Sequence, residues 1–259
     1  MATAKNHETV DWASYEKLSE DAPSSLSWAS NGEEGSGKSD FALSAPGPIY
    51  VCAFDAFGMN RVRKERKVDK DIRIGRYIFQ PVKGQSKNQL GDAAMAVWNK
   101  FVADYRVALQ HVRTVLIDRE DIGYEVLRYA NFGAQNDAPK EYGPLNTEMN
   151  SLYQEATAAG VNLGLLRTNR DKWISKFDPA KGKMVPSNTG ERIPDGWNGV
   201  AGLVDITLSH RWDPIGRVYQ TKIGKFPNSQ ARDQEFPDLD WPLMAMTAYP
   251  DSMPEDWGL

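Results

Sequence analysis

Cysteine and histidine are scarce in this sequence. Cys52 is the single cysteine among 259 residues, and the three histidines, His7, His111 and His210, lie far apart in the chain. One cysteine excludes a disulfide within the chain, and its place inside an apolar run predicts a buried thiol in a reducing compartment. Ligands so few and so scattered do not make a zinc site.

Long apolar runs and an excess of positive charge are also missing. No run of about 18 apolar residues is present, so the sequence predicts no membrane-spanning segment and no membrane partner. Residues 1–7 lack the apolar core of a secretory signal, and we therefore expect a cytoplasmic protein. The net charge of −4 argues against a uniformly basic nucleic-acid binder but is compatible with a local basic groove.

The length and composition are those of an ordinary globular protein. Hydrophobic residues make up 41% of the chain and charged residues 25%, and the length suffices for one large α/β domain or two small ones. Short apolar runs alternate with segments of helical spacing, and we find no internal repeat and no separable second domain. The predicted strands cover residues 26–30, 48–55, 74–79, 112–118, 161–166, 200–212 and 217–223, and the predicted helices begin near residue 37 or cover 92–109, 122–132, 144–156 and 241–246.

The most specific feature of the sequence is the stretch GEEGSGKS at residues 32–39, which fits the phosphate-binding pattern G-x-x-x-x-G-K-[ST] without a mismatch. It follows a predicted strand and precedes a predicted helix, as that motif requires. Glycines let the backbone turn successive N–H groups toward a phosphate, and the start of the helix adds its positive end. A flexible loop that matches by chance is the alternative.

The last two residues of the pattern, Lys38 and Ser39, have different predicted roles. The Lys38 ammonium would reach the β- and γ-phosphates of a nucleoside triphosphate, and the Ser39 hydroxyl would bind Mg²⁺. The sequence therefore predicts ATP and Mg²⁺ as ligands. The predicted nucleotide-binding residues are Gly32, Glu33, Glu34, Gly35, Ser36, Gly37, Lys38, Ser39 and Asp40.

Two predicted strands end in an aspartate, Asp55 and Asp118. Ligands of open α/β sheets bind at the carboxyl ends of the strands, so both carboxylates are candidates for the nucleotide site. Four hydrophobic positions before Asp118 form the Walker B pattern, whose carboxylate would hold the hydration shell of Mg²⁺ next to Ser39. For Asp55, capping of the following loop is an equal alternative.

Glu120 lies two residues after Asp118. Its carboxylate would polarise the attacking water in a hydrolysis reaction. Alternatively, it caps the helix predicted over residues 122–132.

Two segments are rich in positive charge, residues 61–76 and residues 176–198. The first is either a solvated face or a contact with a phosphate backbone. The second is too long and too polar for a tight turn, and we expect a mobile hairpin or insertion there, where function tends to concentrate. Residues 167–170, after the strand 161–166, would sense the γ-phosphate or form an ordinary loop.

The order of these motifs resembles the phage-type nucleotide-binding proteins that have a RecA-like core and no added DNA-binding domain. Members of that group are associated with phage recombination and single-strand annealing. The resemblance covers roughly residues 25–245. It rests on residues 32–39, 115–118, 124–128 with 132–133, 142–146 and 160–163, and on a terminal hairpin that ends in KIGK at residues 222–225.

The resemblance implies a fold and catalytic residues. The fold is α/β, a P-loop NTPase with a RecA-like three-layer αβα core, a mostly parallel sheet and a C-terminal antiparallel hairpin. Asp118 is the Walker B acid, and Asp55 stands where RecA-like enzymes usually carry the glutamate that activates water. Lys222 and Lys225 match the basic residues that such assemblies insert into the ATP site of a neighbouring subunit, where they would neutralise charge on the γ-phosphate.

The resemblance also implies a contact with DNA. Residues 168–173 fall where RecA-like proteins place a DNA-contacting loop, and the basic insertion extends it. Trp173, Phe177 and Trp197 would stack on bases, although packing in the core is an alternative for Trp197. The predicted DNA-binding residues are Arg167, Arg170, Lys172, Lys176, Lys181 and Lys183.

The leading hypothesis is a homo-oligomeric, Mg²⁺-dependent ATPase, in a ring or a filament, that acts on single-stranded DNA in recombination or annealing. It implies a phage protein in the host cytoplasm, with a single-strand-binding protein as a further partner. A ring helicase or packaging motor is one alternative, and a nucleotide-dependent binding module with little turnover is another. We expect an N-terminal arm at residues 1–24, the ATPase domain at 25–248 and an acidic tail at 249–259.

Overall fold

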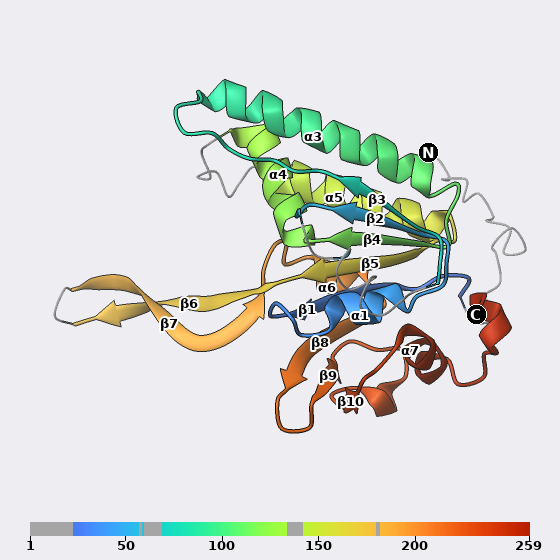
Figure 1. Ribbon diagram of the computed structural model, residues 1–259. Coiled ribbons are helices and arrows are strands. Elements are labelled where there is room, and N and C mark those ends of the chain that lie inside the picture. Colours follow the sequence, from blue (N-terminus) through green and yellow to red (C-terminus); the bar gives the residue numbers. More distant parts are fainter. Residues whose placement is uncertain (1–22, 57–58, 60–68, 134–141, 180–181) are drawn as a thin grey trace, which may run out of the picture.

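The computed structural model describes residues 23–56, 59, 69–133, 142–179 and 182–259 (Figure 1). Most of the expected N-terminal arm, much of the basic stretch 61–76 and Lys181 therefore lie outside the described residues. Among the described residues, no helix combines the length and the apolar character needed to cross a lipid bilayer.

Eight strands of the described chain form one mixed sheet in the order β10-β9-β8-β1-β5-β4-β2-β3. The six strands from β8 to β3 pair in parallel, and β9 and β10 add an antiparallel edge. The prediction of an α/β fold with a mostly parallel sheet and a C-terminal antiparallel hairpin is confirmed. The strands are β1 (Ser27–Gly32), β2 (Ile49–Ala53), β3 (Ile72–Arg76), β4 (Thr114–Asp118), β5 (Asn162–Arg167), β8 (Ile206–Asp213), β9 (Val218–Ile223) and β10 (Glu235–Pro237).

Helices cover both faces of this sheet because its parallel strands are apolar on both sides. Successive residues of β1 show this, since Trp28 belongs to one apolar cluster and Ala29 to the other. The first cluster packs under α1 (Lys38–Leu43) and α7 (Trp241–Ala248). The second packs under α3 (Lys87–Ala108), α4 (Glu120–Phe132), α5 (Tyr142–Ala158) and the short α6 (Val200–Leu203) (Figure 1).

Several element boundaries differ from the sequence prediction. Helix α3 begins five residues earlier than predicted, at Lys87, because Ser86 and Gln89 form a reciprocal capping box in a segment that reads as polar loop. The predicted strand 200–212 is wrong at its start, where residues 200–203 are helical. Val200 and Val204 are both buried, and their spacing of four fits one face of a helix.

The basic insertion forms a long antiparallel pair, β6 (Asn169–Asp178) and β7 (Lys183–Pro194), which we call the ribbon. It begins seven residues before the predicted start of the insertion. The ribbon extends well beyond the carboxyl ends of the parallel strands (Figure 1). Few contacts to the rest of the chain are needed to hold a paired ribbon in shape, because its backbone hydrogen bonds are internal.

The segment expected as an acidic tail packs against the domain. Trp257 is 1% exposed, and its ring lies 5.8 Å from that of Trp241. Its indole N–H donates to the Ser252 hydroxyl at 2.9 Å, which satisfies the buried donor. Through Trp257, and through Tyr249 packed beside it, this segment contributes to the first apolar cluster.

The tight packing of β5 gives a stability prediction. A Cβ on Gly164 would lie 2.4 Å from the Trp28 ring and 2.7 Å from a methyl group of Leu116. We expect Gly164→Ala to lower the free energy of unfolding by about 1–3 kcal/mol, because both neighbours are fully buried and must move. Gly202→Ala, where a Cβ meets nothing within 4 Å, is the matched control in denaturant unfolding. Equal stabilities of the two variants would contradict this account.

Candidate functional site

Residues 32–39 form a glycine-rich loop between the end of β1 and the start of α1. Gly35 and Gly37 have φ angles of 72° and 97°, which other residues adopt only with strain. A Cβ on Gly37 would also lie 2.6 Å from the Tyr219 ring. The observed turn therefore requires glycine at these two positions. Helix α1 is only six residues long, so its dipole adds little, and the loop itself must supply the binding groups.

Lys38 folds back over the glycine-rich loop. Its Nζ donates to the carbonyl oxygens of Gly32 at 2.8 Å and Glu33 at 2.7 Å, and it lies 3.4 Å from the Ser36 hydroxyl. Burial lowers the pKa of Lys38, and the charge of Asp118 opposes that shift. The ammonium therefore lies over the loop and interacts electrostatically with the Asp118 carboxylate. Ser39 is half-buried in the first turn of α1.

Asp118 ends β4, with β5 between it and the strand of the glycine-rich loop. The residue is 6% exposed, and its Oδ2 has no hydrogen-bond partner within the described part of the chain. Burial, and after it the charge of Asp55, raise the pKa of Asp118 to about 7, although Arg119 and Lys38 oppose the rise. An orphaned buried carboxylate oxygen next to a cation is a position that a bound ligand would complete.

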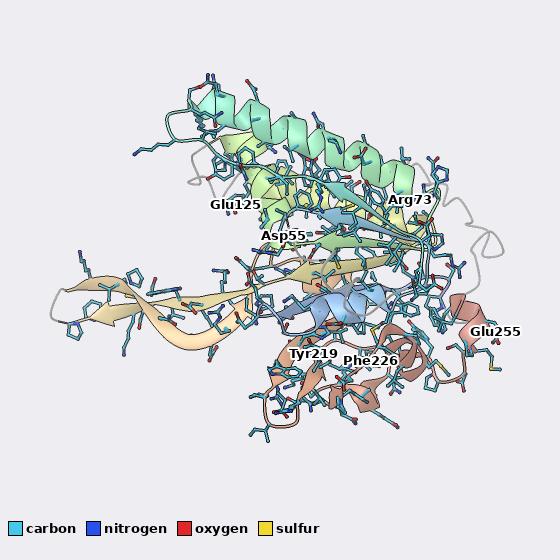
Figure 2. All side chains as sticks on the ribbon, in the orientation of Figure 1. Asp55, Arg73, Glu125, Tyr219, Phe226 and Glu255 are labelled. Atoms are coloured by element: carbon cyan, nitrogen blue, oxygen red, sulfur yellow. The ribbon has the colours of Figure 1, made fainter. Side chains whose placement is uncertain are left out.

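Asp55 follows β2 at the same edge of the sheet (Figure 2). Residue Ala53 pairs in register with Asp118, and the N–H of Phe54 donates to the Asp118 carbonyl at 3.0 Å. The two carboxylates therefore follow the ends of neighbouring strands. The sequence predicts the strand-end position of each residue, and the structure shows that the two strands are neighbours. They can share a hydrated Mg²⁺, which proteins typically bind through one or two carboxylates together with substrate phosphates. Among the described residues, this edge of the sheet included, no three His, Cys, Asp or Glu side chains gather into a metal-binding cluster.

Glu120 and Arg167 form a buried ion pair. Arg167 Nε lies 3.1 Å from Glu120 Oε2, and the Tyr153 hydroxyl donates to Glu120 Oε1 at 2.8 Å. Glu120 is 0% exposed and Arg167 is 4% exposed. Burial raises the pKa of Glu120, and the Arg167 guanidinium opposes that rise. Both side chains are therefore enclosed by protein in this arrangement, and neither is exposed to water or to a DNA strand at the surface.

The same guanidinium fixes the segment that follows the ribbon. Arg167 donates to the carbonyl oxygens of Asp195 and of Trp197. Trp197 packs against Tyr153 with ring centroids 6.2 Å apart, in agreement with the core-packing alternative for this residue. The ion pair thus stabilises the junction between β5, α4 and the end of the ribbon.

Asp121 is a site residue that the sequence analysis missed. Its carboxylate accepts hydrogen bonds from the Arg119 guanidinium at 2.9 Å and from the Thr168 hydroxyl at 2.9 Å. It also acts on the pKa of both Lys38 and Asp118. The run of three charged residues after Asp118 was the available signal, but a helix start commonly carries acids and gives no reason to single this one out.

The ribbon contacts the glycine-rich loop at its base. Arg192 Nη2 lies 3.1 Å from the Glu33 carboxylate, and Asn31 donates to the side chain of Asn169 at 3.2 Å. Within the ribbon, Arg170 pairs with Asp195 at 3.2 Å and Lys172 with Glu191 at 2.7 Å. These predicted DNA-binding cations are therefore partly engaged by acids.

The outer part of the ribbon is apolar and basic. Trp173 and Phe177 lie four residues apart on the same face of β6, and they are 57% and 56% exposed. Met184 on β7 is the partner of Phe177 in the register. Lys176 and Lys183 are also exposed near this end. Exposed aromatic rings combined with lysines are the groups that bind single-stranded nucleic acid.

Lys222 and Lys225 lie away from the glycine-rich loop of their own chain. Because β9 runs antiparallel, its residue Tyr219 packs on the loop while Lys225 lies toward the opposite edge. Lys225 donates to the carbonyl oxygens of Gly202 and Val204 around the end of α6, and Lys222 Nζ lies 3.7 Å from Asp233. A role for either lysine in the site of a neighbouring copy stays a prediction.

Beneath the loop, His210 is a structural residue. Its Nε2 is 3.0 Å from the Ser30 hydroxyl and its Nδ1 is 3.0 Å from the Thr221 hydroxyl. Burial lowers the pKa of His210 to about 3, so the ring is neutral at physiological pH.

The chain was compared with protein-family models and with curated protein sequences. No family model matches the chain. No curated protein matches it either. Its function must therefore be inferred from the geometry of the site.

The raised pKa of Asp118 predicts a pH-dependent stability. An acid whose pKa is higher in the folded state makes the protein less stable as pH rises from its ordinary value of about 4 to about 7. We expect Asp118→Asn to stabilise the ligand-free protein by about 4 kcal/mol at pH 8 and by about 1–2 kcal/mol at pH 5, where the unfolded carboxyl is still mostly ionised. Denaturant unfolding at both pH values measures the difference, with Glu125→Gln on the exposed face of α4 as control. The same gain at both pH values would contradict the shift.

Proposed function

We propose that this chain is a Mg²⁺-dependent P-loop ATPase. One observation carries the proposal. Lys38 of the glycine-rich loop interacts electrostatically with Asp118, whose buried Oδ2 has no hydrogen-bond partner within the described residues. The oxygens of a triphosphate would replace the carbonyl oxygens of Gly32 and Glu33 as acceptors of the hydrogen bonds that the Lys38 ammonium donates. Ser39 and Asp118 would hold the Mg²⁺, which supplies charge neutralisation of the phosphates when bound.

Asp55 is the residue that we propose to orient the attacking water. It lies at the end of the strand next to β4, so its carboxylate faces the same edge as Asp118. Glu120 is left out of this role because its carboxylate is enclosed by Arg167 and Tyr153. Lys38 would stabilise the charge that develops on the transferred phosphoryl group.

We further propose single-stranded DNA as the partner of the ribbon, and a homo-oligomer as the assembly that brings the Lys222 and Lys225 of one copy to the next. Support for DNA comes from the exposed rings of Trp173 and Phe177 on one face of the ribbon and from the exposed Lys176 and Lys183 on its other face. Pairing or annealing of single strands is the activity that such a surface serves, since base stacking and phosphate contacts do not depend on sequence.

A nucleotide-dependent binding module with little turnover is the second candidate. The burial of Glu120 favours it, because the longer of the two acids near the site is closed to water. In that case ATP would bind at the same loop and control the ribbon, and hydrolysis would be slow.

The proposal predicts a specific loss of activity. With Mg²⁺ present, we expect ATP hydrolysis to rise several-fold on addition of single-stranded DNA, and Lys38→Ala to reduce the rate at least 100-fold, because the charge on the phosphates is no longer neutralised. Lys100→Ala, which removes an exposed lysine on α3, should leave the rate unchanged. ATP binding without turnover would reject the enzyme and favour the binding module. Binding that does not depend on Lys38 would reject both.

A second prediction concerns the ribbon. The double variant Lys176→Ala, Lys183→Ala should bind single-stranded DNA more weakly and with a smaller dependence on salt. Loss of two phosphate contacts lowers the slope of log K against log salt by about 1.4. Binding titrations at several salt concentrations measure it, with Lys100→Ala as control. An unchanged slope would show that the DNA does not contact this end of the ribbon.

A further inference from the structure

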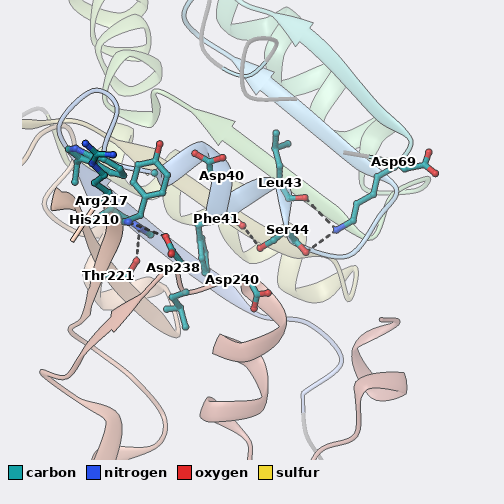
Figure 3. Close-up of a pocket in the computed structure, with 15 residues that line it drawn as sticks. Asp40, Phe41, Leu43, Ser44, Asp69, His210, Arg217, Thr221, Asp238 and Asp240 are labelled. Carbon is teal, nitrogen blue, oxygen red and sulfur yellow. Dashed lines mark hydrogen bonds between the residues drawn. The ribbon is translucent and has the colours of Figure 1, made fainter. Parts of the chain in front are cut away.

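A cavity of about 730 Å³ adjoins the glycine-rich loop (Figure 3). It begins at Gly37 and Asp40 and runs along α1 as far as Ser44, with the β8–β9 hairpin and residues 238–240 as its other walls. Its size is within the range that small-molecule and cofactor sites have. Gly37 and Asp40 are shared with the predicted nucleotide-binding residues, whereas Lys38, Ser39, Asp55 and Asp118 do not line the cavity.

The cavity is lined by aromatic rings on the side next to the loop. In β8 and β9, His210 pairs with Thr221 and Trp212 pairs with Tyr219, and all four line the cavity. Tyr219 is in direct contact with the loop, because a Cβ on Gly37 would meet its ring at 2.6 Å. Trp212 is 46% exposed, and its ring centroid lies 5.0 Å from that of Tyr219. A half-exposed tryptophan next to a phosphate-binding loop is an open stacking surface.

The charges around the cavity disfavour phosphate. Four aspartates line it, Asp40, Asp69, Asp238 and Asp240, against the two cations Lys70 and Arg217. Lys70 is already engaged, since its Nζ donates to carbonyl oxygens at the end of α1, those of Ser44 at 2.9 Å and Ala45 at 2.7 Å. The neutral His210 adds no charge. An uncharged ligand with N–H and O–H donors suits this lining, whereas a further phosphate does not.

We propose that this cavity is a nucleoside subsite, in which the base of the bound nucleotide stacks on Trp212, beside the Tyr219 ring that is inclined by 62° to it, while its phosphates lie in the glycine-rich loop. The inference rests on the proposed nucleotide binding at that loop. A nucleoside attached to phosphates in the loop must occupy a neighbouring space, and the contact between Tyr219 and Gly37 joins the two spaces directly. The carboxylates would accept hydrogen bonds from the ribose hydroxyls or from amino groups of the base.

The test compares two ligands that differ only in the nucleoside, ATP and inorganic tripolyphosphate, each titrated calorimetrically into the full chain with excess Mg²⁺. We expect ATP to bind at least tenfold more tightly than tripolyphosphate, because stacking of one base contributes about 1–3 kcal/mol. Trp212→Ala should weaken ATP binding about tenfold and leave tripolyphosphate binding unchanged. Trp212→Phe, which keeps an aromatic face, should restore most of the ATP affinity.

The matched control is Ile215→Ala. Ile215 lies at the turn of the same hairpin and is 95% exposed, and it does not line the cavity. Its loss should change neither affinity. Equal affinities of ATP and tripolyphosphate, both lost in Lys38→Ala, would overturn the subsite and leave the proposed function standing. Parallel weakening of both ligands in Trp212→Ala would assign the tryptophan to hairpin structure and also overturn the subsite. Tripolyphosphate binding that is indifferent to Lys38→Ala would contradict the proposed function itself.

Discussion

The electrostatic balance between Lys38 and Asp118 is the constraint on which this end of the molecule depends. Each group is largely removed from water, which is costly for an isolated charge. Lys38 is stabilised by loop carbonyl oxygens, whereas Asp118 keeps one oxygen without a partner and lies in the field of Asp55. An anion in the loop and a divalent cation beside the carboxylate would correct both deficits together. A site that is electrostatically incomplete without ligand is thereby prepared to bind one.

The fold was predictable where its signals are local. The strand that ends at Asp118 has a continuous apolar run before that residue, and glycine spacing alone marks the turn before Lys38. The prediction was wrong where a local pattern is ambiguous. Residues 200–204 are apolar at a spacing that fits either a strand or a helix, and the choice is made by the burial of Val200 and Val204 under neighbouring elements. In residues 249–259, the acidic side chains favoured the prediction of a tail, although Trp257 packs against Trp241 in the core.

The candidate site was predictable only in part, for a related reason. Lys38, Asp55 and Asp118 follow from motifs and from their positions at strand ends. The partners of Glu120 and Arg167 do not, because the two residues are 47 positions apart in sequence and meet only when β5 lies beside β4. An ion pair of this kind carries no sequence signature. The contact of Thr168 with Asp121 has the same origin and was missed for the same reason.

The attachment of the ribbon has a thermodynamic consequence. Arg192 contacts the Glu33 carboxylate, so one side chain of the glycine-rich loop is in contact with the base of the ribbon, which extends beyond the sheet. A ligand that displaces Glu33 from Arg192 would change the energy of the contact between the loop and the ribbon. Linkage is reciprocal, so whatever restrains the far end must alter affinity at the loop by the same factor. The contact between Arg192 and the Glu33 carboxylate is in this way a link between two surfaces that share no ligand.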